Sequence, residues 1–193
     1  MSWVSGLNRT ELGHLGAAVY FSKTFRFDVF RVNPPLTRIV SGAALKLASP
    51  EVDWKSYSPH PRDRAEWEIG CALVGASSRE EIRRWTFLAR CSLMPLLLLG
   101  GYFGYRLARE IYGSGAGVVF LLLWCFSPFL LSWGATACPD AAAAALGTLA
   151  VYSLRCWLQK PGWSRCVVAG ACLGLLPLGK STWVIAFGVW PLI

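Results

Sequence analysis

Charged residues are scarce in this chain of 193 residues, because Lys, Arg, Asp and Glu together make up only 16% of it. Soluble domains carry about 25%. The shortfall falls in the second half, where apolar runs approach the roughly 20 residues that a helix needs to cross a bilayer. With a mean hydropathy of +0.43, the composition excludes a soluble domain with a large core and predicts a polytopic membrane protein.

Runs of basic residues are missing as well. The net charge of +8 could indicate a nucleic-acid partner, but the Lys and Arg residues are scattered along the chain. A nucleic-acid-binding surface needs them clustered. Basic residues that flank membrane spans explain the charge more simply, so we expect no nucleic-acid partner.

The cysteines lack a paired spacing. The chain has 7 of them but no CxxC motif, and most lie singly in or beside apolar runs, where Cys behaves as a small hydrophobic residue. This pattern favours neither a zinc site nor a disulfide framework. No cofactor is evident, and a divalent metal ion stays an open option.

A cleavable signal peptide is not visible, because residues 1–10 contain no apolar core. No span precedes Glu11, and the chain stops inside an apolar run at Ile193. We therefore interpret the sequence as a fragment of a longer protein, with either a first transmembrane helix lost or a start codon placed too late.

The first third of the chain predicts short helices rather than spans. Residues from Glu11 to Phe21 form an amphipathic pattern that is too short and too polar to cross a bilayer, so an interfacial helix is expected. Phe25 to Arg31 alternates aromatic and charged residues, which favours an extended segment. The corner Asn33-Pro34-Pro35-Leu36 is stiff, and a second short helix is expected over about 36–48.

The rest of the chain predicts a helical membrane domain. Glu51 to Glu68 is polar and is expected to form an extramembrane loop, and Ser77 or Ser78 is expected to cap the helix that enters the first span. About four spans of sufficient apolar length follow, over about 85–108, 118–134, 141–158 and 166–193, the last interrupted by Pro177 and Lys180. Small residues, such as Gly170 with Gly174 and the run Ala141–Ala145, allow close helix packing.

These expectations define the fold class and the domains. The predicted fold is all-α, a polytopic membrane helical bundle with short interfacial helices. Residues 1–84 form the first external loop with its juxtamembrane helices, and residues 85–193 form a partial transmembrane domain.

The short loops predict the orientation. On one side they contain Arg106, Arg109, Arg155, Lys160 and Arg165. The opposite loop, Trp133 to Asp140, contains no basic residue. The positive-inside rule places the basic loops in the cytoplasm, so Asp140 and Glu11 both face outward. We expect a multi-pass protein of the plasma (inner) membrane with its site on the external face.

Several short motifs follow one another along the chain. They are Glu11-x-x-His14, Arg31-Val32-Asn33-Pro34-Pro35-Leu36, Ala89-Arg90, Ser127-Pro128, Cys138-Pro139-Asp140 and the stretch from Gly174 to Thr182 that contains Lys180. In this order they resemble the GT-C glycosyltransferases, and most of all the branch of protein O-mannosyltransferases and lipid A aminoarabinose transferases. The resemblance covers nearly all of the chain, but only the amino-terminal part of the family's domain.

The resemblance implies a function. Such enzymes transfer a sugar from a polyprenyl-phosphate carrier to a lipid, glycan or protein acceptor on the non-cytoplasmic side. Their first external loop begins with Asp-Glu, and the Asp is the usual candidate for the catalytic base. Here Thr10 stands at the Asp position and Glu11 at the Glu position. Glu11 can still act as the base, because a carboxylate beside an acceptor hydroxyl accepts its proton during the attack.

The predicted site residues follow from this chemistry. The catalytic candidates are Glu11 and Asp140, and the substrate-binding candidates are His14, Arg31, Asn33, Arg38 and Lys180. Lys180 is the best cation for the leaving phosphate, because a charge inside a span is expensive and usually functional. Arg31 and Arg38 can add forked phosphate contacts.

Each candidate also has a simpler explanation. Glu11 can be a first-turn acid favoured by the helix dipole, His14 a structural residue, Asp140 a helix cap, and Lys180 a side chain that extends to the interface. The corner can be a rigid turn. The alternative function is a non-catalytic membrane protein, namely a scaffold, a transporter piece or a degenerate relative of the same fold. Thr10 favours the degenerate relative, whereas the lack of repeated helix breaks disfavours a transporter.

Overall fold

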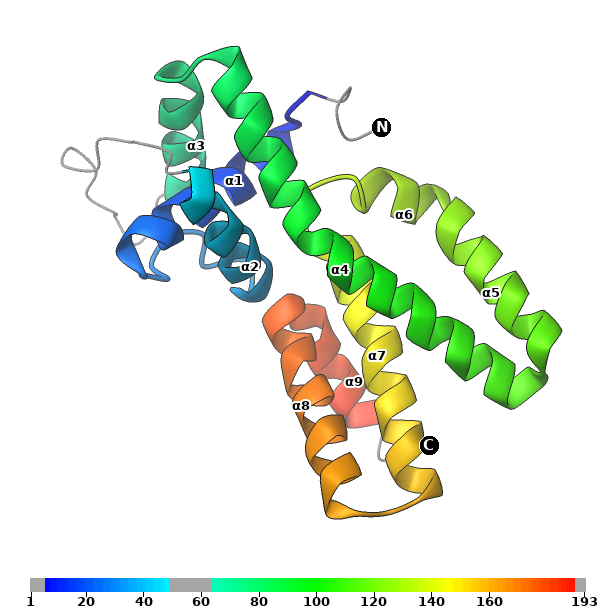
Figure 1. Ribbon diagram of the computed structural model, residues 1–193. Helices are drawn as coiled ribbons and strands as arrows, with labels where there is room; N and C mark the ends of the chain where they lie inside the picture. Colours follow the sequence, from blue (N-terminus) through cyan, green and yellow to red (C-terminus); the bar gives the residue numbers. More distant parts are fainter. Residues whose placement is uncertain (1–5, 49–63, 190–193) are drawn as a thin grey trace. The chain divides into compact units, whose positions relative to one another are not determined.

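The computed structural model describes residues 6–48 and 64–189 (Figure 1). Helices account for the regular structure of both ranges, and neither range contains a strand, so the all-α prediction is confirmed. Two helices, α4 (Arg79–Tyr112) and α7 (Pro139–Gln159), are long and apolar enough to cross a membrane. Two further apolar helices are shorter, α5 (Ser114–Phe126) and α8 (Trp163–Gly179).

The chain forms two compact units. The amino-terminal unit consists of Met1–Leu93 and Ala135–Cys138, and the carboxy-terminal unit of Met94–Gly134 and Pro139–Ile193. Helix α4 begins in the first unit and ends in the second. Pro95 lies inside this helix without ending it.

The amino-terminal unit is built around α1 (Arg9–Thr24), which packs against α2 (Leu36–Leu45) and α3 (Ala65–Gly75). Asn8 caps α1, because its Oδ1 accepts a hydrogen bond from the Glu11 N–H (2.7 Å). Phe25 ends the helix in a left-handed conformation, with φ 55°. The caps explain why α1 exceeds the predicted Glu11–Phe21 at both ends.

Backbone packs directly on backbone where α1 meets α3. A Cβ atom on Gly16 would lie 2.7 Å from the backbone nitrogen of Gly70, and one on Gly70 would lie 2.7 Å from the carbonyl oxygen of Leu12. Small residues at such positions let helices approach closely. The close approach buries the facing side of α1, including Leu15 and Val19.

In the rest of this unit, two predicted features are confirmed and the predicted loop differs from the structure at its end. The second short helix is confirmed, because α2 and the 3-10 turn η1 (Lys46–Ala48) together cover Leu36–Ala48. The predicted loop Glu51–Glu68 lies mostly outside the described residues, but its end is helical, because α3 begins at Ala65. The Ser78 cap is confirmed. Its N–H donates to Glu81 Oε2 (2.8 Å) and its Oγ accepts from the Glu81 N–H (3.3 Å), which is the capping-box arrangement.

In the carboxy-terminal unit the second and fourth predicted spans are interrupted. Pro128 separates α5 from α6 (Pro128–Trp133), since a proline cannot donate the next helical hydrogen bond. The expected break at Lys180 is confirmed, because α8 ends at Gly179 and Lys180 is extended, with φ −154° and ψ 126°. Pro177, the other expected break, lies inside α8. The turn η2 (Ser181–Trp183) and α9 (Val184–Val189) follow.

Close packing in this unit occurs at one of the two small-residue patterns indicated by the sequence, the run Ala141–Ala145, and not at the other. A Cβ atom added to Gly170 or Gly174 of α8 would meet no atom within 4 Å, so these two glycines support no close contact among the described residues. Instead, a Cβ on Gly100 of α4 would lie 2.6 Å from Ala145 of α7. Thr148 Oγ1 also donates to the Gly100 carbonyl oxygen (3.0 Å), and these contacts fix α4 against α7.

Candidate functional site with two ion pairs

Glu11 and Arg90 form an ion pair inside the amino-terminal unit, called here the buried pair. Their side chains are 0% and 1% exposed. Arg90 donates from Nε to Glu11 Oε1 (2.8 Å) and from Nη2 to Glu11 Oε2 (2.7 Å). The Ala137 N–H donates a third hydrogen bond to Glu11 Oε1 (2.8 Å). The contact is bidentate, the strongest geometry available to these two side chains.

The buried pair changes the interpretation of Glu11. An acid favoured only by the helix dipole would stay solvated in the first turn, whereas Glu11 is fully enclosed and holds two other segments. Sequence reasoning did not select Arg90 as a site residue. Arg90 lies just inside the first apolar span, and a charge inside a span is usually functional. The same criterion selected Lys180 and could have selected Arg90.

Asp140 and Lys180 form an ion pair in the carboxy-terminal unit, called here the half-buried pair. The Lys180 ammonium donates to Asp140 Oδ1, and the two side chains are 37% and 25% exposed respectively. Asp140 lies in the first turn of α7, and Lys180 follows the end of α8. A charged group taken partly out of water needs such a partner. The structure therefore brings together two of the residues that the sequence selected.

Trp183 holds the segment after Lys180 against α7. Its Nε1 donates to the Ala143 carbonyl oxygen (3.2 Å). Its ring fills the space beside Gly147, where a Cβ atom would lie 2.5 Å from the ring. On the other side, the Lys180 N–H donates to the Leu176 carbonyl oxygen (2.9 Å). Lys180 thus has a fixed backbone and a partly exposed ammonium.

Arg38 is turned into the protein. Its guanidinium donates to the carbonyl oxygens of Val29 (2.5 Å), Phe30 (3.1 Å) and Asn33 (2.8 Å). Burial lowers the pKa of this guanidinium from its usual value, and the charge of Glu66 raises it by a smaller amount. Arg38 is 5% exposed, so its visible role is to hold the backbone of the corner that it follows.

The remaining predicted residues lie around the same corner. Arg31 is exposed and donates from Nε to the Asp28 carbonyl oxygen (3.0 Å). The Asn33 N–H donates to the Phe30 carbonyl oxygen (3.2 Å). His14 is buried, and its ring centroid lies 4.7 Å from that of Phe30. All of these residues belong to the amino-terminal unit, and their predicted contact with substrate stays a prediction.

A family model described as dolichyl-phosphate-mannose-protein mannosyltransferase matches residues 71–189, more than half of the chain. The chain belongs to this family. The match confirms the GT-C glycosyltransferase resemblance, and it includes Arg90, Asp140 and Lys180. No curated protein and no solved structure matches the chain.

Membership in the mannosyltransferase family settles the broad class of the protein. The family is one of membrane glycosyltransferases, and the two helices of spanning length agree with a place in the membrane. Within the described residues, no three His, Cys, Asp or Glu side chains gather into a group that could hold a metal ion.

Proposed function

We propose that the complete protein transfers a sugar from a polyprenyl-phosphate donor to a hydroxyl group of a lipid, glycan or protein, on the non-cytoplasmic face of the plasma (inner) membrane. The family match supports a sugar transferase. The observation that carries the proposal is the half-buried pair, a carboxylate and an ammonium that both keep contact with solvent. The basic residues of the opposite loops support the outward-facing site.

Lys180 binds the donor phosphate. In the described state its ammonium is paired with Asp140, which avoids an isolated charge beside apolar helices. The phosphodiester of the donor carries one negative charge on two non-bridging oxygens, so it can replace the carboxylate as the charged hydrogen-bond partner of the ammonium. When the donor binds, Lys180 exchanges Asp140 for the phosphate.

Asp140 then acts as the general base. Released from Lys180, its carboxylate accepts the proton of the acceptor hydroxyl as the hydroxyl oxygen attacks the anomeric carbon. The bond between that carbon and the phosphate oxygen breaks, and the polyprenyl phosphate leaves with its electron pair. Lys180 stabilises the charge that develops on this leaving group.

Glu11 acts as a positioning residue in this proposal. Both of its carboxylate oxygens accept hydrogen bonds from Arg90, and one also accepts from the Ala137 N–H, so both oxygens already have protein partners. Ala137 lies three residues before Asp140 in the chain. The buried pair thus holds Ala135–Cys138, the segment of its own unit that precedes α7 in the chain.

A divalent cation is compatible with this arrangement. Mg²⁺ is commonly bound by one or two carboxylates together with substrate phosphates and water. The donor phosphate would supply oxygens for the ion, while Asp140 keeps its carboxylate for the proton; the described residues contain no group of three His, Cys, Asp or Glu side chains that could hold the ion without the donor. Loss of transfer in EDTA, restored by added Mg²⁺, would support this part of the proposal.

The test is transfer of radiolabelled mannose from dolichyl-phosphate mannose in membranes that contain the complete protein. Lys180→Met should lower use of the donor, and Asp140→Asn should lower the rate at saturating donor and abolish the acidic limb of the pH–rate profile. Arg165→Gln, an exposed basic residue of α8, is the matched control. Unchanged transfer by Lys180→Met would overturn the proposal.

The degenerate relative is the second candidate. Thr10, at the position where the family has its usual Asp, is the feature that favours it. A folded, membrane-inserted wild-type protein that transfers no sugar from any polyprenyl-phosphate donor would support this candidate. Restored transfer in Thr10→Asp would show that the lost carboxylate is the reason.

A further inference from the structure

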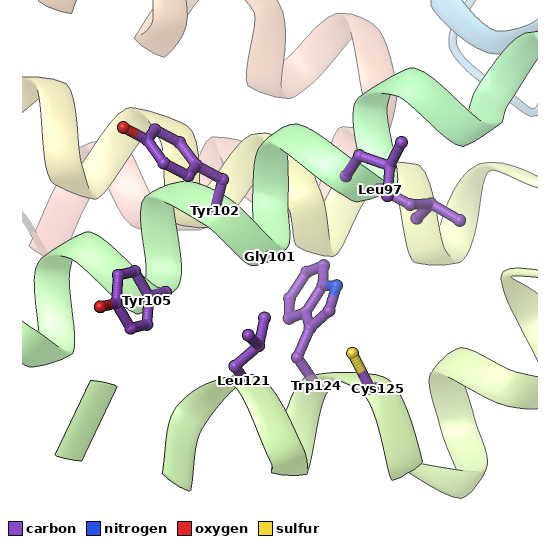
Figure 2. Close-up of a pocket in the computed structure, with 8 residues that line it drawn as sticks. Leu97, Gly101, Tyr102, Tyr105, Leu121, Trp124 and Cys125 are labelled. Atoms are coloured by element: carbon purple, nitrogen blue, oxygen red, sulfur yellow. The ribbon is translucent and has the colours of Figure 1, made fainter. Parts of the chain in front are cut away.

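A groove between α4 and α5 in the carboxy-terminal unit has no part in the proposed reaction. Its volume is about 350 Å³. Figure 2 shows Leu121, Trp124 and Cys125 of α5 pointing toward α4, whereas the Tyr102 ring projects from α4 on the side away from α5. Its lining residues are Leu97, Leu98, Gly101, Tyr102, Tyr105, Leu121, Trp124 and Cys125.

The groove has an apolar end and a polar end along α4. Leucines line it near Leu97, and Trp124 lies over Gly101, where a Cβ atom would come within 3.0 Å of the indole ring. The phenols of Tyr102 and Tyr105 line the other end. The polarity therefore changes in one direction along the helix.

The polar end continues into two arginines that differ in their partners. Arg106 pairs with Glu110 (2.9 Å). Arg109 is exposed and donates to the Tyr105 hydroxyl (3.4 Å), and no carboxylate of the described residues lies within ion-pair distance of it. Gly117 of α5 packs against Arg109, since a Cβ atom there would lie 3.0 Å from the Arg109 Cβ. An uncompensated guanidinium thus stands where the groove ends.

The length of the groove fits one leaflet. Leu97 and Arg109 are separated along α4 by about 18 Å, at about 1.5 Å per residue. Half of the hydrocarbon core is about 15 Å. A single acyl chain that starts at Arg109 would therefore run through the groove to the middle of the bilayer.

We propose that this groove binds an anionic glycerophospholipid, with one acyl chain between α4 and α5 and the phosphate on Arg109. The charge of Arg109 favours a headgroup with a net negative charge, and the tyrosine hydroxyls of Tyr102 and Tyr105 can donate to its oxygens. Basic pockets between membrane helices on the cytoplasmic side bind such lipids. The basic residues of the neighbouring loops place Arg109 on that side, away from the sugar-transfer site.

The experiment uses the complete protein in mild detergent, titrated with dioleoylphosphatidylglycerol or dioleoylphosphatidylcholine, with bound lipid counted by native mass spectrometry. The wild type should prefer the anionic lipid by roughly fivefold, the usual worth of one basic residue near a membrane surface. Arg109→Gln should abolish this preference. Arg165→Gln is the matched control and should keep it.

A second pair of variants tests the groove itself. Cys125→Phe fills the groove and should lower binding of both lipids, whereas Leu123→Phe, on an exposed position of the same helix outside the groove, should leave binding unchanged. Thermal unfolding checks that each variant folds, and Leu121→Trp replaces Cys125→Phe if the latter does not.

Three results would overturn the proposal. The first is equal lipid preference in the wild type and Arg109→Gln. The second is evidence that lipid does not occupy the groove, either because binding is unchanged in the folded groove-filling variant or because no lipid is bound at all. The latter is expected when another helix of the protein covers the groove. The third is displacement of phosphatidylglycerol by equimolar dolichyl phosphate, which would assign the groove to the carrier lipid.

Discussion

Each of the two units contains an ion pair, and the two pairs differ in their exposure to solvent. In the amino-terminal unit, Glu11 and Arg90 are 0% and 1% exposed, and further hydrogen bonds reach Ala137 and Gly6. In the carboxy-terminal unit, Lys180 and Asp140 are 37% and 25% exposed. The fully enclosed pair holds together the segments that it joins, whereas the pair that keeps contact with solvent has room to exchange partners. Exposure therefore separates the positioning pair from the proposed reacting pair.

The largest expected effect is on sugar transfer, and it distinguishes Asp140 from Glu11. Asp140→Asn should reduce sugar transfer by about 10²–10⁴-fold, the usual worth of general base catalysis, and should flatten the acidic limb of the pH–rate profile. Glu11→Gln should also reduce transfer, but it should keep the shape of that profile. Loss of the acidic limb in Glu11→Gln instead would make Glu11 the base, as the sequence predicted.

The second effect separates the pairs by stability. Arg90→Met should lower the free energy of unfolding by about 3–5 kcal/mol, because it leaves the Glu11 carboxylate buried without its partner. Lys180→Met should cost at most about 1 kcal/mol, since partly exposed pairs contribute little. Detergent-based unfolding measures both.

The double variant Glu11→Leu with Arg90→Met is the control for that comparison. Replacing both members by apolar side chains removes the unpaired charge, so it should recover much of the loss. A double variant as unstable as Arg90→Met alone would contradict the role assigned to the buried charge.

The third effect concerns helix packing in the two units. Gly70→Ala should destabilise the protein by about 1–3 kcal/mol, because its Cβ would meet the Leu12 backbone at 2.7 Å. Gly104→Ala should cost less, since its Cβ meets the tip of the Phe120 ring, which can rotate away. Gly75→Ala, with no atom within 4 Å, is the control and should be neutral or stabilising.

The smallest effect is a pH dependence in the amino-terminal unit. Burial raises the pKa of the Tyr20 hydroxyl above its usual value, and the nearby Asp28 carboxylate raises it further. A raised pKa in the folded state contributes stability that is complete below the usual pKa of about 10. This stability is lost as the pH rises through the folded pKa. Thermal unfolding should show that the wild type loses stability more steeply than Tyr20→Phe as the pH rises from about 9 to 11. This range extends about one pH unit to either side of the usual pKa.

Local patterns in the sequence were sufficient for the class of the protein and for several elements. Apolar runs indicated the all-α membrane class, and the Ser78–Glu81 spacing indicated the start of α4, because hydropathy and capping act over a few neighbouring residues. The sequence also selected Lys180 and Asp140 separately, from the cost of a charge in an apolar span and from the order of motifs.

Only the tertiary structure decided how the charges are paired. Arg90 reaches Glu11 across 79 positions of the chain, and Lys180 reaches Asp140 across 40. It also turned Arg38 toward the carbonyl groups of its own corner. A charged side chain in an apolar environment must find a partner, but which partner it finds depends on the folded path of the backbone, since residues this far apart meet only when their helices pack together.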